Sequence, residues 1–262
     1  MTPLITLLSD FGLVDGYVGA MKGVLLRRCP EARLIDLSHE IAPGSIDMGA
    51  YVLHQAGPWF PEATIHLAVV DPGVGSERRA VVLDSGTHRY VAPDNGLLTL
   101  VLEAAPDGRA FLIENEALWE PEVSPVFHGR DIFSPVAAHL ASGGGLEAVG
   151  PQVPLDSLVR RPWPLYSHTD TVRTGQVIHV DRFGNLVTNL RIRGAENAIG
   201  TVEVSGYRIP VARTYSDVPE GELVALRGST GLLEIACHYG SALERLGSDD
   251  RLVVTWRLRE ES

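Results

Sequence analysis

The fold is decided at Leu4-Ile5-Thr6-Leu7-Leu8-Ser9-Asp10-Phe11-Gly12, where an apolar run of strand type ends in a polar turn. Apolar residues then repeat at helical spacing across Asp15–Arg28, and Asp15 is placed to cap that helix. A second strand-like run, Arg33–Leu37, follows. A strand, a helix and a strand in this order predict two parallel strands joined by a crossover helix.

The same alternation continues through the first part of the chain. Further strands are predicted at Thr64–Val70, Ala80–Asp84, Arg89–Ala92 and Arg109–Ile113, and further helices at Ile46–Gln55, Leu97–Ala104 and Ile132–Ala141. We therefore expect residues 1–160 to form a Rossmann-like α/β domain, in which helices cover both faces of a mostly parallel sheet.

The pattern changes at Val159–Leu165, where two prolines lie close to charged residues. We interpret residues 161–171 as a linker. Short alternating runs separated by turn residues follow it, at Gly175–Val180, Thr201–Val204, Tyr207–Val211, Glu222–Leu226, Leu232–Ala236 and Arg251–Trp256. Residues 172–262 are accordingly predicted to form an all-β, barrel-like domain.

Composition disfavours several classes of protein. The formal net charge of −11, without a long basic cluster, argues against a nucleic-acid partner. No apolar run approaches the roughly 20 residues of a membrane span, and the N-terminus lacks signal-peptide features, so a cytoplasmic protein is expected. Cys29 and Cys237 suggest neither a disulfide framework nor a zinc site, and His39-Glu40 lacks the second histidine of a metalloprotease motif. We expect no metal and no cofactor.

Two polar blocks follow predicted strands, where ligands of open α/β sheets bind. Asp10 in the first block can accept hydrogen bonds from two sugar hydroxyls, or it can cap the following turn. In the second block, Asp71-Pro72-Gly73-Val74-Gly75-Ser76-Glu77-Arg78-Arg79, the ends of a tight loop bring Asp71 and Arg78 within reach of an ion pair. The alternative is a surface turn with exposed charges. The block lacks the third glycine of a dinucleotide fingerprint.

Four further blocks carry polar or aromatic residues. Asp94-Asn95-Gly96 is typical of a structural turn. His128, in Phe127-His128-Gly129-Arg130-Asp131, stands at a helix entrance, where it is either functional or a capping residue. Asp181-Arg182-Phe183-Gly184-Asn185 suits a heteroaromatic ring, since Phe183 can stack on it and Asn185 can bind its edge. The last block, Ser229-Thr230-Gly231-Leu232-Leu233-Glu234, presents hydroxyls and backbone amides.

In this order the six blocks resemble the S-adenosylmethionine hydroxide adenosyltransferase family, the hydrolase relatives of the fluorinating and chlorinating adenosyl enzymes. The resemblance extends from Leu8 to Ala236. It implies an α/β N-terminal domain and a barrel-like C-terminal domain. It also implies a homotrimer in which the ligand lies between the N-terminal domain of one subunit and the C-terminal domain of the next.

The resemblance also implies roles for individual residues. Asp10 matches the acid that holds the ribose diol, and Asp15 a residue near the methionine amino group. Asp71, Arg78 and His128 match a triad that positions or activates water. The positions expected around the adenosyl and methionine groups are Phe127, Asp181, Phe183, Asn185, Ser229 and Glu234. Thr230 departs from the halogenating relatives, which carry an arginine toward the methionine carboxylate.

The expected activity is hydrolysis of S-adenosyl-L-methionine to adenosine and L-methionine, by attack of water or hydroxide at C5′. A sulfonium leaves without protonation, so the site has only to align the nucleophile. His128 is the natural proton acceptor by its ordinary pKa. Halide transfer is the alternative, but a carboxylate about 5 Å from a halide costs roughly 3 kcal/mol at an effective dielectric near 20. A non-catalytic adenosine-binding or S-adenosylmethionine-binding module is the third hypothesis.

Overall fold

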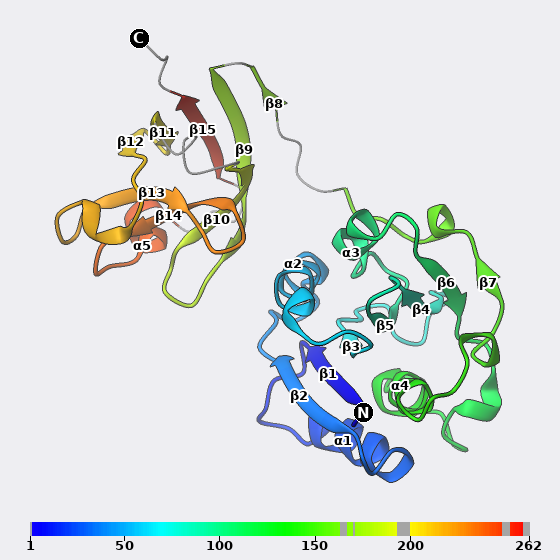
Figure 1. Cartoon of the computed structure of the whole chain (residues 1–262). Coiled ribbons are helices and arrows are strands. Elements are labelled where there is room, and N and C mark those ends of the chain that lie inside the picture. The colour runs from blue at the N-terminus through cyan, green and yellow to red at the C-terminus, as the bar shows by residue number, and fades with distance from the viewer. Residues whose placement is uncertain (1, 163–166, 170, 193–199, 248–251, 259–262) are drawn as a thin grey trace. The chain divides into compact units, whose positions relative to one another are not determined.

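A computed structural model of the chain describes residues 2–162, 167–169, 171–192, 200–247 and 252–258 (Figure 1). The chain divides into two compact units, Met1–Arg161 and Pro162–Ser262, each with its own core. Part of the predicted linker, residues 163–166 and 170, falls outside the described residues. The linker therefore stays a prediction.

The N-terminal unit is built on one seven-stranded sheet. Its strands are β1 (Leu4–Ser9), β2 (Arg33–Ser38), β3 (Ile65–Val69), β4 (Ala80–Asp84), β5 (Arg89–Pro93), β6 (Arg109–Leu112) and β7 (Gln152–Val153). They lie in the order β2-β1-β3-β5-β4-β6-β7.

The sheet is parallel from β2 through β1 and β3 to β5, and antiparallel from β5 through β4 and β6 to β7. The prediction of a mostly parallel, Rossmann-like sheet is therefore correct only in part. The reason is the hairpin between β4 and β5, whose four connecting residues are too few for a crossover helix.

Helices cover both faces of this sheet, as predicted. The helices are α1 (Tyr17–Arg28), α2 (Ile46–Ala56), α3 (Thr99–Ala104) and α4 (Ser134–Ala141), and short helical turns occur at Gly57–Trp59, Glu116–Leu118, Leu146–Ala148 and Leu155–Ser157. Residues of α1 and α4 share a core with one face of the strands, and residues of α2 and α3 share a core with the other face. The predicted cap of α1 is wrong, because Gly16 rather than Asp15 precedes Tyr17 and no side chain caps the helix.

The C-terminal unit is an antiparallel sheet that nearly closes on itself. Its strands are β8 (Ser167–His168), β9 (Val172–Val180), β10 (Leu186–Arg191), β11 (Gly200–Val204), β12 (Tyr207–Pro210), β13 (Leu223–Arg227), β14 (Leu232–Cys237) and β15 (Val253–Leu258). The order runs β12-β11-β15-β9-β10-β14-β13, with β8 beside β9. A bridge between Val211, just after β12, and Ala225 of β13 brings the two ends together.

Trp256 and other buried side chains fill the interior of this sheet. The strand β10 was not predicted, and the unit also contains a five-residue helix, α5 (Ala242–Leu246), so it is not wholly β. Arg251, the predicted start of the last strand, lies outside the described residues.

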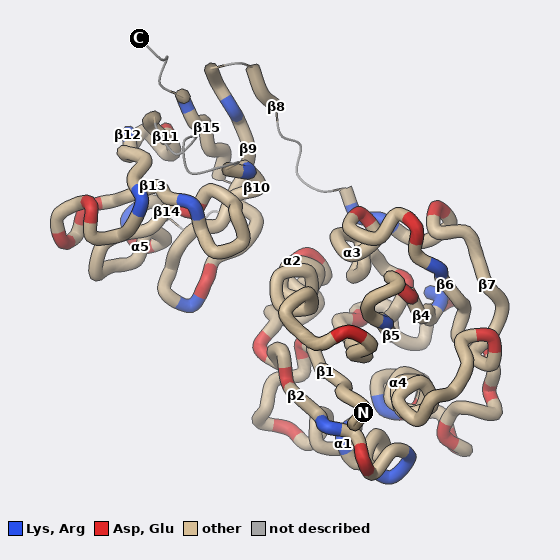
Figure 2. The backbone as a smooth tube through the Cα atoms, viewed as in Figure 1, with Lys and Arg blue, Asp and Glu red and all other residues tan. Residues whose placement is uncertain are grey.

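Among the described residues, every helix is too short or too polar to cross a bilayer. Lysine and arginine residues are interspersed with aspartate and glutamate residues in each unit (Figure 2).

Candidate functional site

Two of the predicted site residues lie at one edge of the N-terminal sheet. Asp10 directly follows β1, and Asp71 comes two residues after β3. Because β1 and β3 are parallel, with Ser9 opposite Val69, both acids emerge from the carboxyl ends of neighbouring strands. This is the edge where open α/β sheets bind their ligands.

Arg78 joins Asp71 and His128. Its Nε lies 2.9 Å and its Nη2 2.6 Å from Asp71 Oδ2, and Nη2 lies 2.8 Å from His128 Nδ1. The Asp71 side chain is 4% exposed and the Arg78 side chain 10%, so this ion pair is largely removed from water. A charge-assisted, two-point contact of this kind fixes the orientation of the guanidinium.

The backbone of the second block shapes the loop that carries this pair. Gly75 has φ +79°, and a Cβ atom there would lie 2.5 Å from the carbonyl oxygen of Pro125. The loop is therefore packed against the segment that leads to His128. Arg78 also stacks over the Phe133 ring, with its Cζ 5.2 Å from the ring centroid.

The contact with Arg78 determines the protonation of His128. A guanidinium only donates, so His128 Nδ1 accepts its hydrogen bond and the neutral imidazole carries its proton on Nε2. Burial, and next the charge of Arg78, lower the pKa of His128 below its ordinary value. In this tautomer Nε2 is a hydrogen-bond donor, whereas the sequence leads us to expect that His128 accepts a proton, and the role of His128 stays a prediction.

His128 precedes a π-helical turn, Gly129–Phe133, that leads into α4. The predicted helix Ile132–Ala141 thus begins with this irregular turn, in which the amide of Ser134 donates to Gly129 O. Arg130 pairs with the buried Asp131, with 2.6 Å between Nε and Oδ1, and stacks over Phe127. Irregular turns of this type are frequent at functional sites.

Phe127 packs in an aromatic cluster at the same edge. Its ring centroid lies 6.0 Å from that of Phe11 and 5.4 Å from that of Tyr17. Tyr17 is half exposed and opens α1. Asp10 Oδ2 accepts a 2.8 Å hydrogen bond from the amide of Gly44, whereas Asp15 is exposed.

The predicted ring-binding turn of the C-terminal unit is held by Asp181. One carboxylate oxygen accepts the amides of Phe183 and Asn185 at 2.8 and 2.9 Å, and the other accepts Asn185 Nδ2 at 2.9 Å. The side chain of Phe183 points into solvent, and the residue is 76% exposed. Gly184 has φ +80° and packs against Ser241, where a Cβ atom would clash.

Glu234 of β14 is electrostatically coupled to this turn. It accepts a 2.8 Å hydrogen bond from the Tyr215 hydroxyl, and burial, together with the charge of Asp181, raises its pKa. Burial and the bond to Glu234 raise the pKa of Tyr215 to about 12. Ser229 is exposed in the turn before β14. Tyr215 is not among the residues predicted for the site, because no motif singles it out.

The third block is structural, as its composition indicates. Asn95 donates to Val70 O and accepts the amide of Leu97. Arg79 turns away from Arg78 and pairs with Asp94, with 2.8 Å between its Nε and Asp94 Oδ2. The neighbouring arginines therefore have separate partners.

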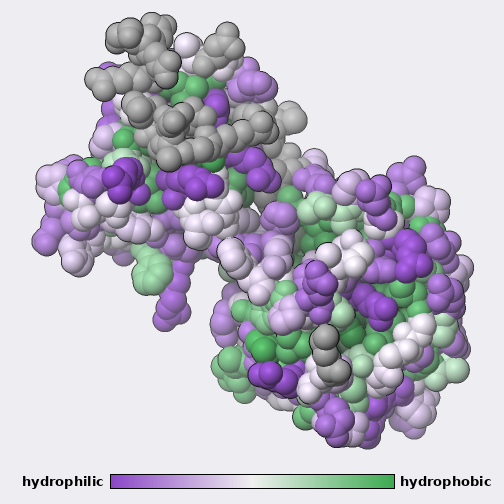
Figure 3. Space-filling model, in the orientation of Figure 1, coloured by the Kyte–Doolittle hydropathy of each residue, from purple (hydrophilic) through white to green (hydrophobic). Residues whose placement is uncertain are grey.

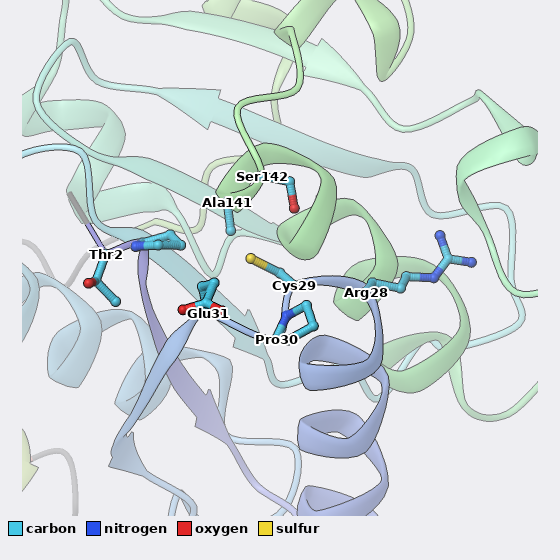
Figure 4. Close-up of a pocket in the computed structure, with 8 residues that line it drawn as sticks. Thr2, Arg28, Cys29, Pro30, Glu31, Ala141 and Ser142 are labelled. Carbon is cyan, nitrogen blue, oxygen red and sulfur yellow. The ribbon is translucent and has the colours of Figure 1, made fainter.

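A pocket in the N-terminal unit lies away from the predicted site residues. It is lined by Thr2, Pro3, Arg28, Cys29, Pro30, Glu31, Ala141 and Ser142, at the beginning of β1 and the ends of α1 and α4 (Figure 4). None of the predicted site residues lines it. Among the described residues, no group of three or more histidine, cysteine, aspartate or glutamate side chains is arranged to hold a metal ion.

Two family models match this chain. The model of the SAM hydroxide adenosyltransferase N-terminal domain covers residues 5–150, and that of the C-terminal domain covers residues 175–255. The chain belongs to the SAM hydroxide adenosyltransferase family. The two matched segments fall within the two compact units.

Individual proteins are similar to this chain over nearly its whole length. An (R)-S-adenosyl-L-methionine hydrolase of Thermus thermophilus is 47% identical, over 94% of this chain and 96% of its own. A fluorinase of Nocardia brasiliensis is 30% identical, over 91% of both chains. The crystal structure of an uncharacterized conserved protein from Thermotoga maritima matches with a TM-score of 0.89 and 36% identity, covering 97% of this chain and 99% of that one.

Proposed function

We propose that this protein hydrolyses S-adenosyl-L-methionine to adenosine and L-methionine, with water or hydroxide attacking C5′. The observation that carries the proposal is Arg78, which binds both Asp71 and His128 at the carboxyl edge of the sheet. Membership of the family and the 47% identity to an (R)-S-adenosyl-L-methionine hydrolase support it. That relative's name also leads us to propose the (R)-sulfonium epimer as the substrate.

The proposed chemistry follows from the protonation of the site. The C5′–S bond breaks, its electron pair goes to sulfur to give the neutral thioether of methionine, and a C5′–O bond forms. His128 donates from Nε2 to the attacking oxygen, which turns a lone pair toward C5′. The positive charge of Arg78 stabilises hydroxide character on that oxygen, and attack by water releases one proton to solvent.

The reaction needs neither a metal nor an organic cofactor. The sulfonium is already a good leaving group, so no Lewis acid has to activate it. We therefore propose that S-adenosylmethionine is bound as a substrate alone. Asp10 would hold its ribose diol and Phe183 would stack on its adenine, with Asn185 at the ring edge.

Halide transfer is the competing activity, because a fluorinase is among the relatives. Against it stands Asp71, a carboxylate whose side chain is 4% exposed. An anion at the nucleophile position would be repelled by that charge, and Arg78 offsets the repulsion without reversing it. We therefore favour an uncharged water molecule, which gains hydroxide character only as it attacks, as the nucleophile.

We further propose a homotrimer in which the N-terminal unit of one subunit and the C-terminal unit of the next share each site. Apolar side chains reach the surface in both units (Figure 3). Val14 and Val126 are 99% and 74% exposed in the segments that flank Asp10 and His128, and Phe183 is 76% exposed. Exposed apolar residues next to a polar site are typical of an interface. Light scattering tests the assembly, and a fully active monomer would contradict the shared site.

The proposed activity is tested by incubating the purified protein with each sulfonium epimer and separating the products by chromatography. Adenosine and methionine from the (R)-epimer are expected. A 5′-halo-adenosine would favour the competing activity, and tight binding without products would favour a binding module. The Asp71→Asn variant is the matched control, because it keeps the shape of the side chain and removes the charge that holds Arg78.

A further inference from the structure

A buried serine–histidine pair lies directly behind Asp10. Ser9 Oγ lies 2.7 Å from His39 Nδ1, and the two residues are 0% and 3% exposed. Ser9 is the last residue of β1, and His39 follows β2. Neither residue takes part in the proposed hydrolysis.

An irregularity between β1 and β2 brings these two residues together. Leu7 pairs with Asp36 but Leu8 pairs with Ser38, so Leu37 is an extra residue in β2. Such a bulge turns the following side chains. Here it places His39 beside Ser9 at the point where the chain leaves the sheet toward Asp10.

The outer edge of His39 faces a carboxylate. Asp36 Oδ1 lies 3.1 Å from His39 Nε2, and Asp36 Oδ2 accepts a 2.7 Å hydrogen bond from Lys22 of α1. Burial acts to raise the pKa of Asp36, but Lys22 and His39 outweigh it and lower that pKa. His39 Nε2 makes no hydrogen bond of standard geometry among the described residues, but the nearby ionised carboxylate favours the imidazole proton on Nε2, so the Ser9 hydroxyl donates to Nδ1.

The Ser9–His39 pair holds the loop that carries Asp10. Ser9 Oγ accepts the amide of Phe11 at 3.3 Å, and the His39 carbonyl oxygen accepts the amide of Gly12 at 2.8 Å. His39 thus binds the loop on both sides of Asp10, once through its side chain and once through its backbone. Gly12 has φ +65°, a conformation that favours glycine at this sharp turn.

A serine, a histidine and an aspartate in contact also suggest a nucleophilic triad. Ser9 is 0% exposed, however, and its hydroxyl already donates to His39 while accepting from Phe11. A substrate cannot reach that oxygen. The arrangement therefore positions the loop and does not itself attack a substrate.

We infer that the buried Ser9–His39 pair positions the Asp10 carboxylate for a ribose 2′,3′-diol, which makes His39 a positioning residue for nucleoside recognition. This inference rests on the proposed function, because that function gives Asp10 its ligand. It predicts that disturbing His39 removes the preference for the diol and leaves recognition of the adenine unchanged.

The test compares binding of adenosine and 2′,3′-dideoxyadenosine to the full-length protein by calorimetry. Wild-type protein should bind the dideoxy compound roughly 10- to 100-fold more weakly, which corresponds to the loss of a charge-assisted hydrogen bond. His39→Phe should bring the two affinities within about threefold by weakening adenosine alone. His39→Asn should keep the preference, because its amide still reaches Ser9 at the position of Nδ1.

His66→Asn is the matched control. His66 is another fully buried histidine, on β3 next to β1, and its variant should keep the wild-type preference even where its stability falls. A His39→Phe protein that keeps the diol preference, or that loses affinity for both nucleosides equally, would overturn this role of His39. A wild-type protein that binds neither nucleoside would contradict the proposed function, and the role of His39 with it.

Discussion

Among single residues, Arg78 is the one on which the proposed chemistry depends most, since its guanidinium binds Asp71 and His128 together. Arg78→Ala and Asp71→Asn should each lower kcat by about 10²–10³-fold, the usual effect of removing a preorganised charge or donor. The dissociation constant of adenosine should change little, because the triad acts on the attacking oxygen and not on the nucleoside. Single-turnover kinetics and calorimetry measure the two quantities separately.

Arg79→Ala is the control for this pair of variants. Arg79 binds Asp94 instead of Asp71, so its loss should leave kcat unchanged while lowering the free energy of unfolding by about 1–3 kcal/mol. The Asp71→Asn, Arg78→Ala double variant should be little worse than the poorer single variant, because coupled residues are not additive. An inactive Arg79→Ala protein beside an active Arg78→Ala protein would contradict this assignment.

His128 distinguishes a hydrogen-bond donor from a general base. His128→Gln places an amide donor near the position of Nε2 and should retain more activity than His128→Ala. A general base would be lost in both variants. Wild-type kcat should fall as the pH drops through the pKa of His128, which burial and Arg78 place below its ordinary 6.5, because a proton on Nδ1 repels the guanidinium. An equal loss of activity in His128→Gln and His128→Ala would instead indicate that His128 acts as a general base.

At the scale of elements, the Asp181–Asn185 turn presents Phe183 outward for the ring of a ligand. Phe183→Ala should weaken binding of adenosine and of S-adenosylmethionine alike, by about 1–3 kcal/mol, as is usual for base–aromatic stacking. Phe183 is 76% exposed within its own unit, so each unit should still fold in Phe183→Ala, which circular dichroism can check. Tyr207→Ala, an exposed aromatic residue of β12, is the control and should leave both affinities unchanged. Unaltered affinities in Phe183→Ala would show that Phe183 does not bind the ring of the ligand.

Strands and helices of regular pattern were predictable from the sequence. The bounds of β4 agree with prediction, and those of α2 differ by one residue. The strand β10 was missed because Leu186–Arg191 directly follows the Asp181–Asn185 turn, whose polar residues mask the start of its pattern. The direction of β4 depends on a short hairpin, so the periodicity of the sequence did not reveal it.

The candidate site was predictable wherever polar residues interrupt a regular pattern. Asp71, Arg78 and His128 stand in such blocks, and the structure brings them into contact. Ser9 and His39 are thirty residues apart, and only the pairing of β1 with β2 unites them. The proton on His128 Nε2 is a consequence of tertiary contact, which no local motif encodes.

At the scale of the whole molecule, a buried histidine links folding to pH. His66 is fully buried, its Nε2 has no hydrogen-bond partner among the described residues, and burial lowers its pKa to about 3. The unfolded chain takes up this proton near pH 6.5. The contribution of the neutral His66 to the free energy of unfolding is therefore fully present above that pH, and it is lost as the pH falls toward 3.

Chemical denaturation at several pH values measures this loss. His66 should account for up to about 1.4 kcal/mol of unfolding free energy per pH unit between these limits. His66→Asn carries no titrating ring, so the slope over that range should be shallower by that amount. An identical slope in the two proteins would show that other groups cause the acid sensitivity.

The most direct test of the proposed hydrolysis follows the oxygen atom of water into the product. Purified protein is incubated with (R)-S-adenosyl-L-methionine and excess chloride in ¹⁸O-labelled water, and the products are identified by mass spectrometry. Attack of water or hydroxide at C5′ predicts adenosine with one ¹⁸O atom at its 5′ position and unlabelled methionine. Unlabelled adenosine, 5′-chloro-5′-deoxyadenosine, or unchanged substrate would contradict it.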